Sequence, residues 1–150
     1  MVFDYYKKLT RTQQRIYRES DRIASVRLNS AAALLPVVRA LADDLKIRRL
    51  NVRVLAARPH DSHGELHGIY QPRHGVTAAC ITVWMRTARQ KRVVAFRTFL
   101  RTFLHEFGHH LDYELFKLAD SFHTEGFFKR ESSLVRQLAP VKKREVTTRK

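Results

Sequence analysis

The chain has 150 residues, enough for one domain with a sizeable core, and its 44% share of hydrophobic residues excludes a disordered chain. No apolar run approaches the roughly 18–20 residues of a membrane span, no secretory signal is visible, and the single Cys80 cannot form an internal disulfide, so we expect a cytoplasmic protein. The formal net charge of +15 favours contact with polyanions such as nucleic acid.

The first part of the chain is expected to be helical. A strongly basic segment at about residues 4–27 has apolar residues at loosely helical spacing. The sequence AAALLPVVRALADDL, residues 31–45, predicts a second helix that Asn29 or Ser30 could cap. Pro36 inside it predicts a kink or a later start, because proline lacks the N–H of a helix hydrogen bond.

Three segments after the helices have the patterns of strands. LNVRVLAA (50–57) alternates apolar and polar residues, and RPHDSHGE (58–65) interrupts it as a loop. LHGIYQPR (66–73) is consistent with a second strand, and AACITVWM (78–85) is rich in β-branched and aromatic residues. We expect a small sheet in which ITVWM (81–85) is an edge strand that could hold an extended peptide.

Helical periodicity returns at residues 87–117, where apolar residues recur every three or four positions. The segment KLADSFHTEG (117–126) is then expected as a loop. FFKRESSLVRQLA (127–139) predicts a final helix that ends near Pro140.

The long helix carries FLHEFGHHLD, in which His105, Glu106 and His109 form the pattern His-Glu-x-x-His. Two histidines four residues apart lie on one helix face, a turn apart, and can bind one metal ion. Neutral imidazoles suit Zn²⁺, which lowers the pKa of a bound water. Glu106 would take a proton from that water and pass it to a leaving amine. Gly108 would let another part of the chain approach closely.

A catalytic zinc site needs a third protein ligand and an open position. His123 follows a loop long enough to return to the metal, whereas Glu131 on the final helix is the rival ligand. Glu125 is a weaker candidate. Asp112 lies three residues after His109, on the same helix face, and could orient a ligand histidine through a hydrogen bond.

Other polar groups are assigned no definite role. His110 is expected to support the site or to be exposed, and Cys80 to be a small core residue. Tyr70, Tyr113 or an arginine could stabilise an oxyanion, but the sequence selects none of them. The spacing of four further histidines could suggest a second metal site, but one lies on an expected strand and the others in loops, so they are interpreted as solvated residues: His60, His63, His67 and His74.

The segment TFLHEFGHHLDYELFKLADSFHTEGFFKRESSLVRQL (102–138) resembles the active-site region of the SprT-like zinc metallopeptidases, which include the Spartan proteases. In that family a third histidine, an aromatic residue and an amphipathic helix follow the His-Glu-x-x-His helix, and His123 and Phe127 fall at those places. The resemblance covers about residues 50–138. It implies a zincin-like fold, one zinc ion held in part by His123, and protein substrates that include proteins bound to DNA.

Two features depart from the family pattern. Thr124 follows the third histidine where the family usually has glycine, and the single Cys80 leaves no C-terminal zinc ribbon. The segment HEFGHHLD (105–112) is also similar to the motif of lethal-factor-type gluzincins, which use a glutamate as third ligand. That likeness keeps Glu131 open and adds a secreted or injected toxin-like protease as a weaker alternative.

The sequence thus predicts one compact α+β zincin-like domain over residues 1–140. Its N-terminal helical part would span residues 1–46 and its catalytic core residues 50–138, with a small three-stranded sheet, the long motif helix and a closing helix. Residues 141–150 would form a basic mobile tail. The expected function is hydrolysis of peptide bonds by a zinc metallopeptidase. The alternative is a basic nucleic-acid-binding module in which zinc is structural or absent.

Overall fold

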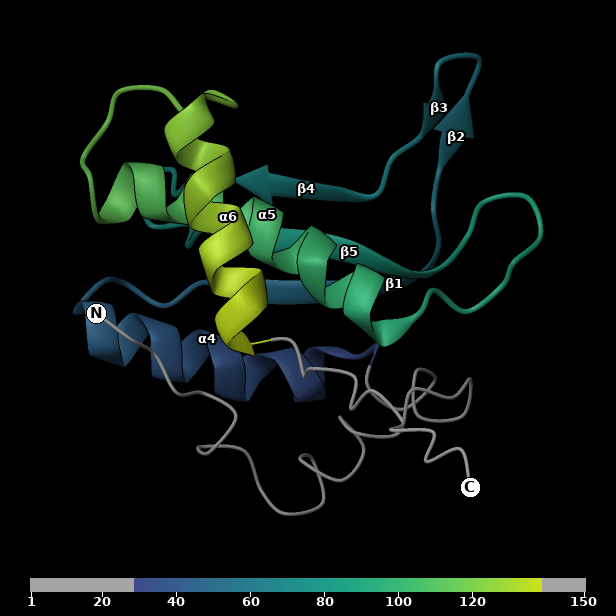
Figure 1. The fold of residues 1–150 in the computed structure, drawn as a ribbon, viewed down its shortest axis with the longest axis horizontal. Helices are drawn as coiled ribbons and strands as arrows, with labels where there is room; N and C mark the ends of the chain where they lie inside the picture. The colour runs from purple at the N-terminus through teal and green to yellow at the C-terminus, as the bar shows by residue number, and fades with distance from the viewer. Residues whose placement is uncertain (1–28, 139–150) are drawn as a thin grey trace, which may run out of the picture.

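Three helices and a small mixed sheet make up the computed structural model of the protein, which describes residues 29–138 (Figure 1). The helices are α4 (Ala31–Leu45), α5 (Phe96–Glu114) and α6 (Glu125–Leu138). The long motif helix and the closing helix are therefore both confirmed. The fold belongs to the expected α+β class.

Two predicted segments lie outside the described residues, namely the basic helix at about residues 4–27 and the tail at residues 141–150. Of the predicted N-terminal helical part, the structure thus describes α4. Within residues 29–138, every helix is too short or too polar to cross a bilayer.

Helix α4 begins and ends where the sequence predicts. The Ser30 hydroxyl accepts a hydrogen bond from the Ala33 N–H at 3.2 Å, which satisfies one of the free amides of the first turn. Asn29, the other candidate cap, instead donates to the Val94 carbonyl at 2.6 Å and ties the start of α4 to the segment before α5. Of the two effects expected of Pro36, the later start is wrong, because the helix begins at Ala31 and continues through Pro36.

The sheet has the strand order β1-β5-β4, in which β1 (Asn51–Ala57) runs parallel and β4 (Gly68–Gln71) antiparallel to β5 (Cys80–Arg86). The three predicted strands are confirmed, but the prediction that residues 81–85 form an edge strand is wrong. Residues 81–84 are all buried, as is typical of a strand with a neighbour on each side. The two edges of the sheet are β1 and β4.

The predicted loop at residues 58–65 contains a short antiparallel hairpin. Its strands are β2 (His60–Asp61) and β3 (Gly64–Glu65), and they project away from the three-stranded sheet (Figure 1). Gly64 has a φ of 126°, a conformation open to glycine and strained for other residues. The sequence pattern missed the hairpin because each strand has only two residues.

Helix α5 begins nine residues later than the predicted segment 87–117. The intervening chain turns back on the end of β5, where the Val94 N–H donates to the Met85 carbonyl at 2.9 Å. The Thr87 N–H closes the turn with the Arg92 carbonyl, also at 2.9 Å. These main-chain hydrogen bonds close a turn where the apolar spacing alone would allow a helix.

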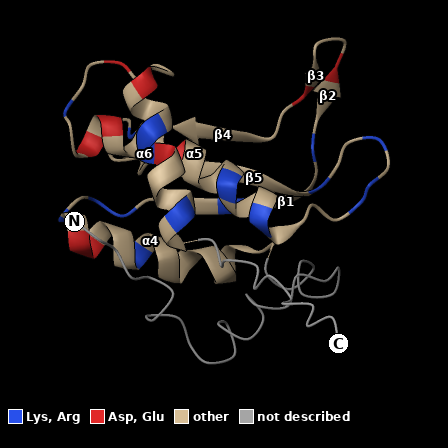
Figure 2. Ribbon diagram, viewed as in Figure 1, with Lys and Arg blue, Asp and Glu red and all other residues tan. Residues whose placement is uncertain are grey.

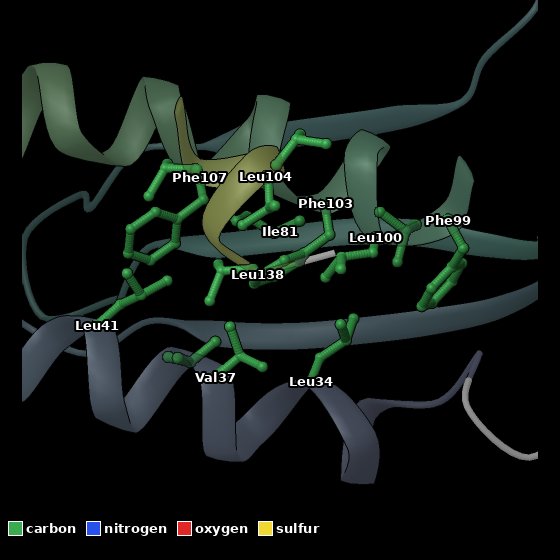
Figure 3. Packing of buried hydrophobic residues seen from close by; sticks show 14 of the residues in the cluster. Leu34, Val37, Leu41, Ile81, Phe99, Leu100, Phe103, Leu104, Phe107 and Leu138 are labelled. Atoms are coloured by element: carbon green, nitrogen blue, oxygen red, sulfur yellow. The ribbon is translucent and has the colours of Figure 1, made fainter. Parts of the chain in front are cut away.

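The core lies where the apolar faces of α4 and α5 meet over one face of the sheet. Figure 3 shows side chains of α4 directed at those of α5, with Ile81 of β5 among them. The opposing side chains are Leu34, Val37 and Leu41 from α4, and Phe99, Leu100, Phe103, Leu104 and Phe107 from α5. Since α5 also carries the metal motif, this packing fixes the helix that presents the site.

Helices α5 and α6 approach closely at Gly108. A Cβ atom on Gly108 would lie 2.9 Å from both Cε2 and Cζ of Phe127, whose side chain is 1% exposed. The predicted close approach at Gly108 is thus confirmed, and the approaching residue is Phe127. Complete burial of such a ring contributes about 1.5–3 kcal/mol to the free energy of unfolding.

We expect Gly108→Ala to destabilise the protein by about 1–3 kcal/mol relative to Gly126→Ala, because the methyl group at Gly108 meets a buried ring. At Gly126 the nearest atom to an added Cβ is the flexible end of Arg130, at 3.3 Å. Both changes replace a helical glycine by alanine, so the difference in urea midpoints isolates the clash. Equal stabilities of the two variants would contradict this packing.

Candidate metal centre

Three histidine rings meet at one end of the α5–α6 contact. His105 and His109 lie one turn apart on α5, and the loop before α6 brings His123 to them. The Nε2 atom of His123 lies 3.0 Å from that of His105 and 3.1 Å from that of His109. Two nitrogens bound to one tetrahedral zinc at about 2.0–2.1 Å would be roughly 3.4 Å apart. The three side chains are therefore close enough to hold one metal ion.

Glu131 lies behind His105 instead of joining the three nitrogens. Its Oε1 atom is 3.0 Å from Nδ1 of His105, and its Oε2 atom is 3.9 Å from the Arg101 guanidinium. An ionised carboxylate can only accept, so Nδ1 carries the proton and Nε2 of His105 keeps a lone pair. Glu131, the alternative third ligand, thus lies where it accepts a hydrogen bond from His105. Glu125, the weaker candidate, is exposed and pairs with Lys129 at 2.7 Å.

Asp112 contacts His109 indirectly, through Ser121. The Ser121 hydroxyl donates to Oδ2 of Asp112 at 2.6 Å, and it lies 2.6 Å from Nδ1 of His109. Because its one proton is directed to the carboxylate, the hydroxyl accepts from the imidazole N–H. Arg130 of α6 donates to the other oxygen of Asp112 at 2.8 Å. The predicted place of Asp112 near a candidate ligand histidine is thus confirmed, whereas Ser121 and Arg130 were not expected there, because no local pattern links them to Asp112.

These contacts fix the same tautomer in both helix histidines. His105 and His109 each have a proton on Nδ1, so their Nε2 lone pairs point to the shared space. Burial, together with the neighbouring His105 and His123, lowers the pKa of His109 to about 4, while Asp112 acts in the opposite direction. A neutral imidazole with a free Nε2 is the form that binds a metal ion.

Glu106 lies between α5 and the edge strand β4, and its side chain is almost fully buried. Burial raises the pKa of Glu106, and Glu131 also raises it, whereas His105 and the Tyr70 main-chain N–H lower it. A Cβ atom on Gly68 of β4 would lie 3.0 Å from Cγ and 3.2 Å from Oε1 of Glu106. Glycine at this point therefore allows β4 to cross directly over the carboxylate.

His110 is neither exposed nor near the shared nitrogens. It is fully buried, its Nε2–H donates to the Arg48 carbonyl at 2.8 Å, and its Nδ1 accepts from the Tyr70 hydroxyl at 2.9 Å. The Tyr70 ring in turn stacks on His109 with 6.3 Å between ring centroids. Burial raises the pKa of Tyr70, and Glu114 raises it further. The Tyr70 hydroxyl, which the sequence suggested as a group that could stabilise an oxyanion, thus donates its hydrogen bond to His110.

Phe127 forms the floor beneath the three histidines. Its ring centroid lies 5.0 Å from that of His105, 4.7 Å from that of His109 and 5.2 Å from that of His123. One buried ring thus contacts all three imidazoles and limits their rotation. Over residues 29–138, the set His105, His109 and His123 is the one group of three or more His, Cys, Asp or Glu side chains with metal-ligand spacing.

Removing His123 should abolish stoichiometric zinc binding, because two histidines alone leave the ion with too few protein ligands. Glu131→Gln should retain about one zinc per chain with an affinity reduced about 10–100-fold, since it changes only the partner of His105. Metal content by elemental mass spectrometry and chelator competition would compare His123→Ala with Glu131→Gln. The reverse pattern would make Glu131 the third ligand.

Asp112→Asn should lower zinc affinity about 10–100-fold, because the amide cannot serve both Ser121 and Arg130 as the carboxylate does. Asp120→Asn is the matched control, since it makes the same chemical change at an exposed residue next to Ser121. Chelator competition at constant pH measures both variants. An Asp112→Asn affinity equal to that of the control would show that the Ser121 contact does not orient His109.

Comparison with known proteins gave no match to a family model, to a curated protein or to a solved structure. The centre is therefore described by its own geometry. Three imidazole nitrogens converge, the carboxylates of Glu131 and Asp112 lie behind them, and the Glu106 carboxylate is buried on the same helix.

Proposed function

We propose that this protein is a zinc-dependent metallopeptidase. His105, His109 and His123 would hold the ion, and Glu106 would act as general base and then general acid. The observation that carries the proposal is the convergence of three Nε2 atoms, two of them in a fixed tautomer, next to a buried glutamate. The resemblance of residues 102–138 to the SprT-like metallopeptidases supports the same assignment.

The donor set suits zinc in particular. Three neutral imidazoles leave a tetrahedral ion with one open position, which is the arrangement of catalytic zinc sites. Zinc in such a site lowers the pKa of a water molecule and polarises a carbonyl oxygen. The chain itself supplies the orientation of the ligands, through Glu131 on His105 and through Ser121 on His109.

The buried position of Glu106 suits proton transfer. A carboxylate whose pKa is raised towards neutrality accepts a proton from the attacking water and returns it to the leaving amine. Its place beneath β4 brings it close to any chain that binds along that edge. Water in the open part of the site would have Glu106 on one side and the histidine nitrogens on the other.

The edge strand β4 is the natural place for an extended peptide substrate. Among the described strands it pairs with β5 alone, so its other edge can add a strand by main-chain hydrogen bonds. This role was expected of residues 81–85, which instead form the central strand. With β4 as the edge strand, the bound peptide would lie beside the strand that crosses Glu106.

The basic charge of the chain concerns which molecules the protein binds, and it has no part in the proposed hydrolysis. Lys and Arg occur on all three helices and in loops at both ends of the described structure (Figure 2). The net charge of +15 is compatible with substrates that are proteins associated with nucleic acid. The competing function, a nucleic-acid-binding module without hydrolysis, predicts salt-sensitive DNA or RNA binding and no proteolysis.

Glu106→Gln should reduce cleavage of an unfolded protein such as casein about 100–10,000-fold, because the amide cannot accept the proton of water. Zinc content and thermal midpoint should stay at wild-type values, since Glu106 is not among the three convergent groups. Glu125→Gln, which changes an exposed acid paired with Lys129, should cleave normally. Equal cleavage by wild type and Glu106→Gln would rule out Glu106 as the base.

A further inference from the structure

Helix α6 begins with two phenylalanines in opposite environments. Phe127 is 1% exposed and lies beneath the histidines, whereas Phe128 is 45% exposed. The Phe128 ring is nevertheless close to the centre, with its centroid 5.7 Å from that of His123 and 6.4 Å from that of His105. An aromatic surface is therefore open to solvent beside two of the candidate ligands.

Core packing does not account for Phe128. The buried stripe of α6 follows helical spacing, and its members are Phe127, Glu131, Leu134, Val135 and Leu138. Phe128 is one position beyond the start of this stripe and faces outward. A single exposed apolar residue is ordinary on a protein surface, so the relevant fact is its position against the histidine rings.

The charged residues that follow Phe128 are both engaged in ion pairs. Lys129 pairs with Glu125 at 2.7 Å, and Arg130 donates to Asp112 at 2.8 Å. The Phe127 ring meets the Phe128 ring at 90° with 5.8 Å between centroids, which holds the exposed ring at a defined angle. In a chain with net charge +15, an exposed aromatic ring thus lies next to His123.

We propose that Phe128 is a specificity-determining residue whose exposed ring contacts a large apolar side chain next to the cleaved bond. This inference rests on the proposed metallopeptidase function and names its substrate class as segments with aromatic or large aliphatic residues. Contact between a ring and an apolar side chain discriminates such substrates from polar ones by about 10–200-fold. The step involves binding only, so it is separable from hydrolysis.

The test uses the zinc-loaded full chain and two small probes that bind metal through a hydroxamate group. N-acetyl-phenylalanine hydroxamate and N-acetyl-aspartate hydroxamate differ only in the side chain offered to the surface beside the metal. We expect the wild type to bind the phenylalanine probe at least about 10-fold more tightly by calorimetry. Phe128→Ala should reduce this preference to about twofold or less, with zinc content unchanged.

Two variants separate a contact from a structural effect. Leu118→Ala removes a side chain that is 48% exposed, close to the 45% of Phe128, and should keep the wild-type preference. Phe128→Lys should shift the preference towards the aspartate probe, an effect that loss of local order would not produce.

The outcomes distinguish this inference from the function on which it rests. Zinc binding with no preference for the phenylalanine probe, or a preference that survives in both Phe128 variants, would overturn the role of Phe128 and leave the metallopeptidase proposal to the Glu106→Gln experiment. Failure of the wild type to bind zinc would overturn the metallopeptidase proposal and this role together.

Discussion

The buried carboxylate of Asp112 joins the three segments on which the site depends. It is 1% exposed, and a charge so far from water is costly unless donors compensate it. Ser121 of the loop and Arg130 of α6 supply these donors at 2.6 and 2.8 Å. The same hydrogen bonds therefore satisfy the carboxylate, hold the loop that carries His123 and fix the tautomer of His109. A single buried charge thus couples helix, loop and closing helix to one geometry.

Helix α5 serves the core and the candidate centre with different faces. Phe103 and Phe107 point into the packing against α4 and the sheet, as Figure 3 shows, whereas His105 and His109 face α6 and the loop. A ligand pair on a helix anchored by such a core has little freedom to move, which favours a preformed site. Glu106 lies between these faces, and this position accounts for both its burial and its contact with β4.

The adjacent residues Phe127 and Phe128 at the start of α6 have different roles, because one is buried and the other exposed. Phe127 fills the space left by Gly108 and supports all three imidazoles from below. Phe128 is partly exposed next to His123. Adjacent residues on a helix differ by about 100° in direction, so one turn can supply both the floor of a site and part of its rim.

The sequence by itself determined the helices and the residues that share a face. Its periodicity predicted α4, α5 and α6 and three strands, and the spacing of His105 and His109 required a common face, because these features depend on local geometry. Tertiary structure alone decided that β5 is central and β4 an edge, that Glu131 lies behind His105, and that Ser121 joins Asp112 to His109. Strand order and the path of a loop follow from packing between distant segments, which no local spacing encodes.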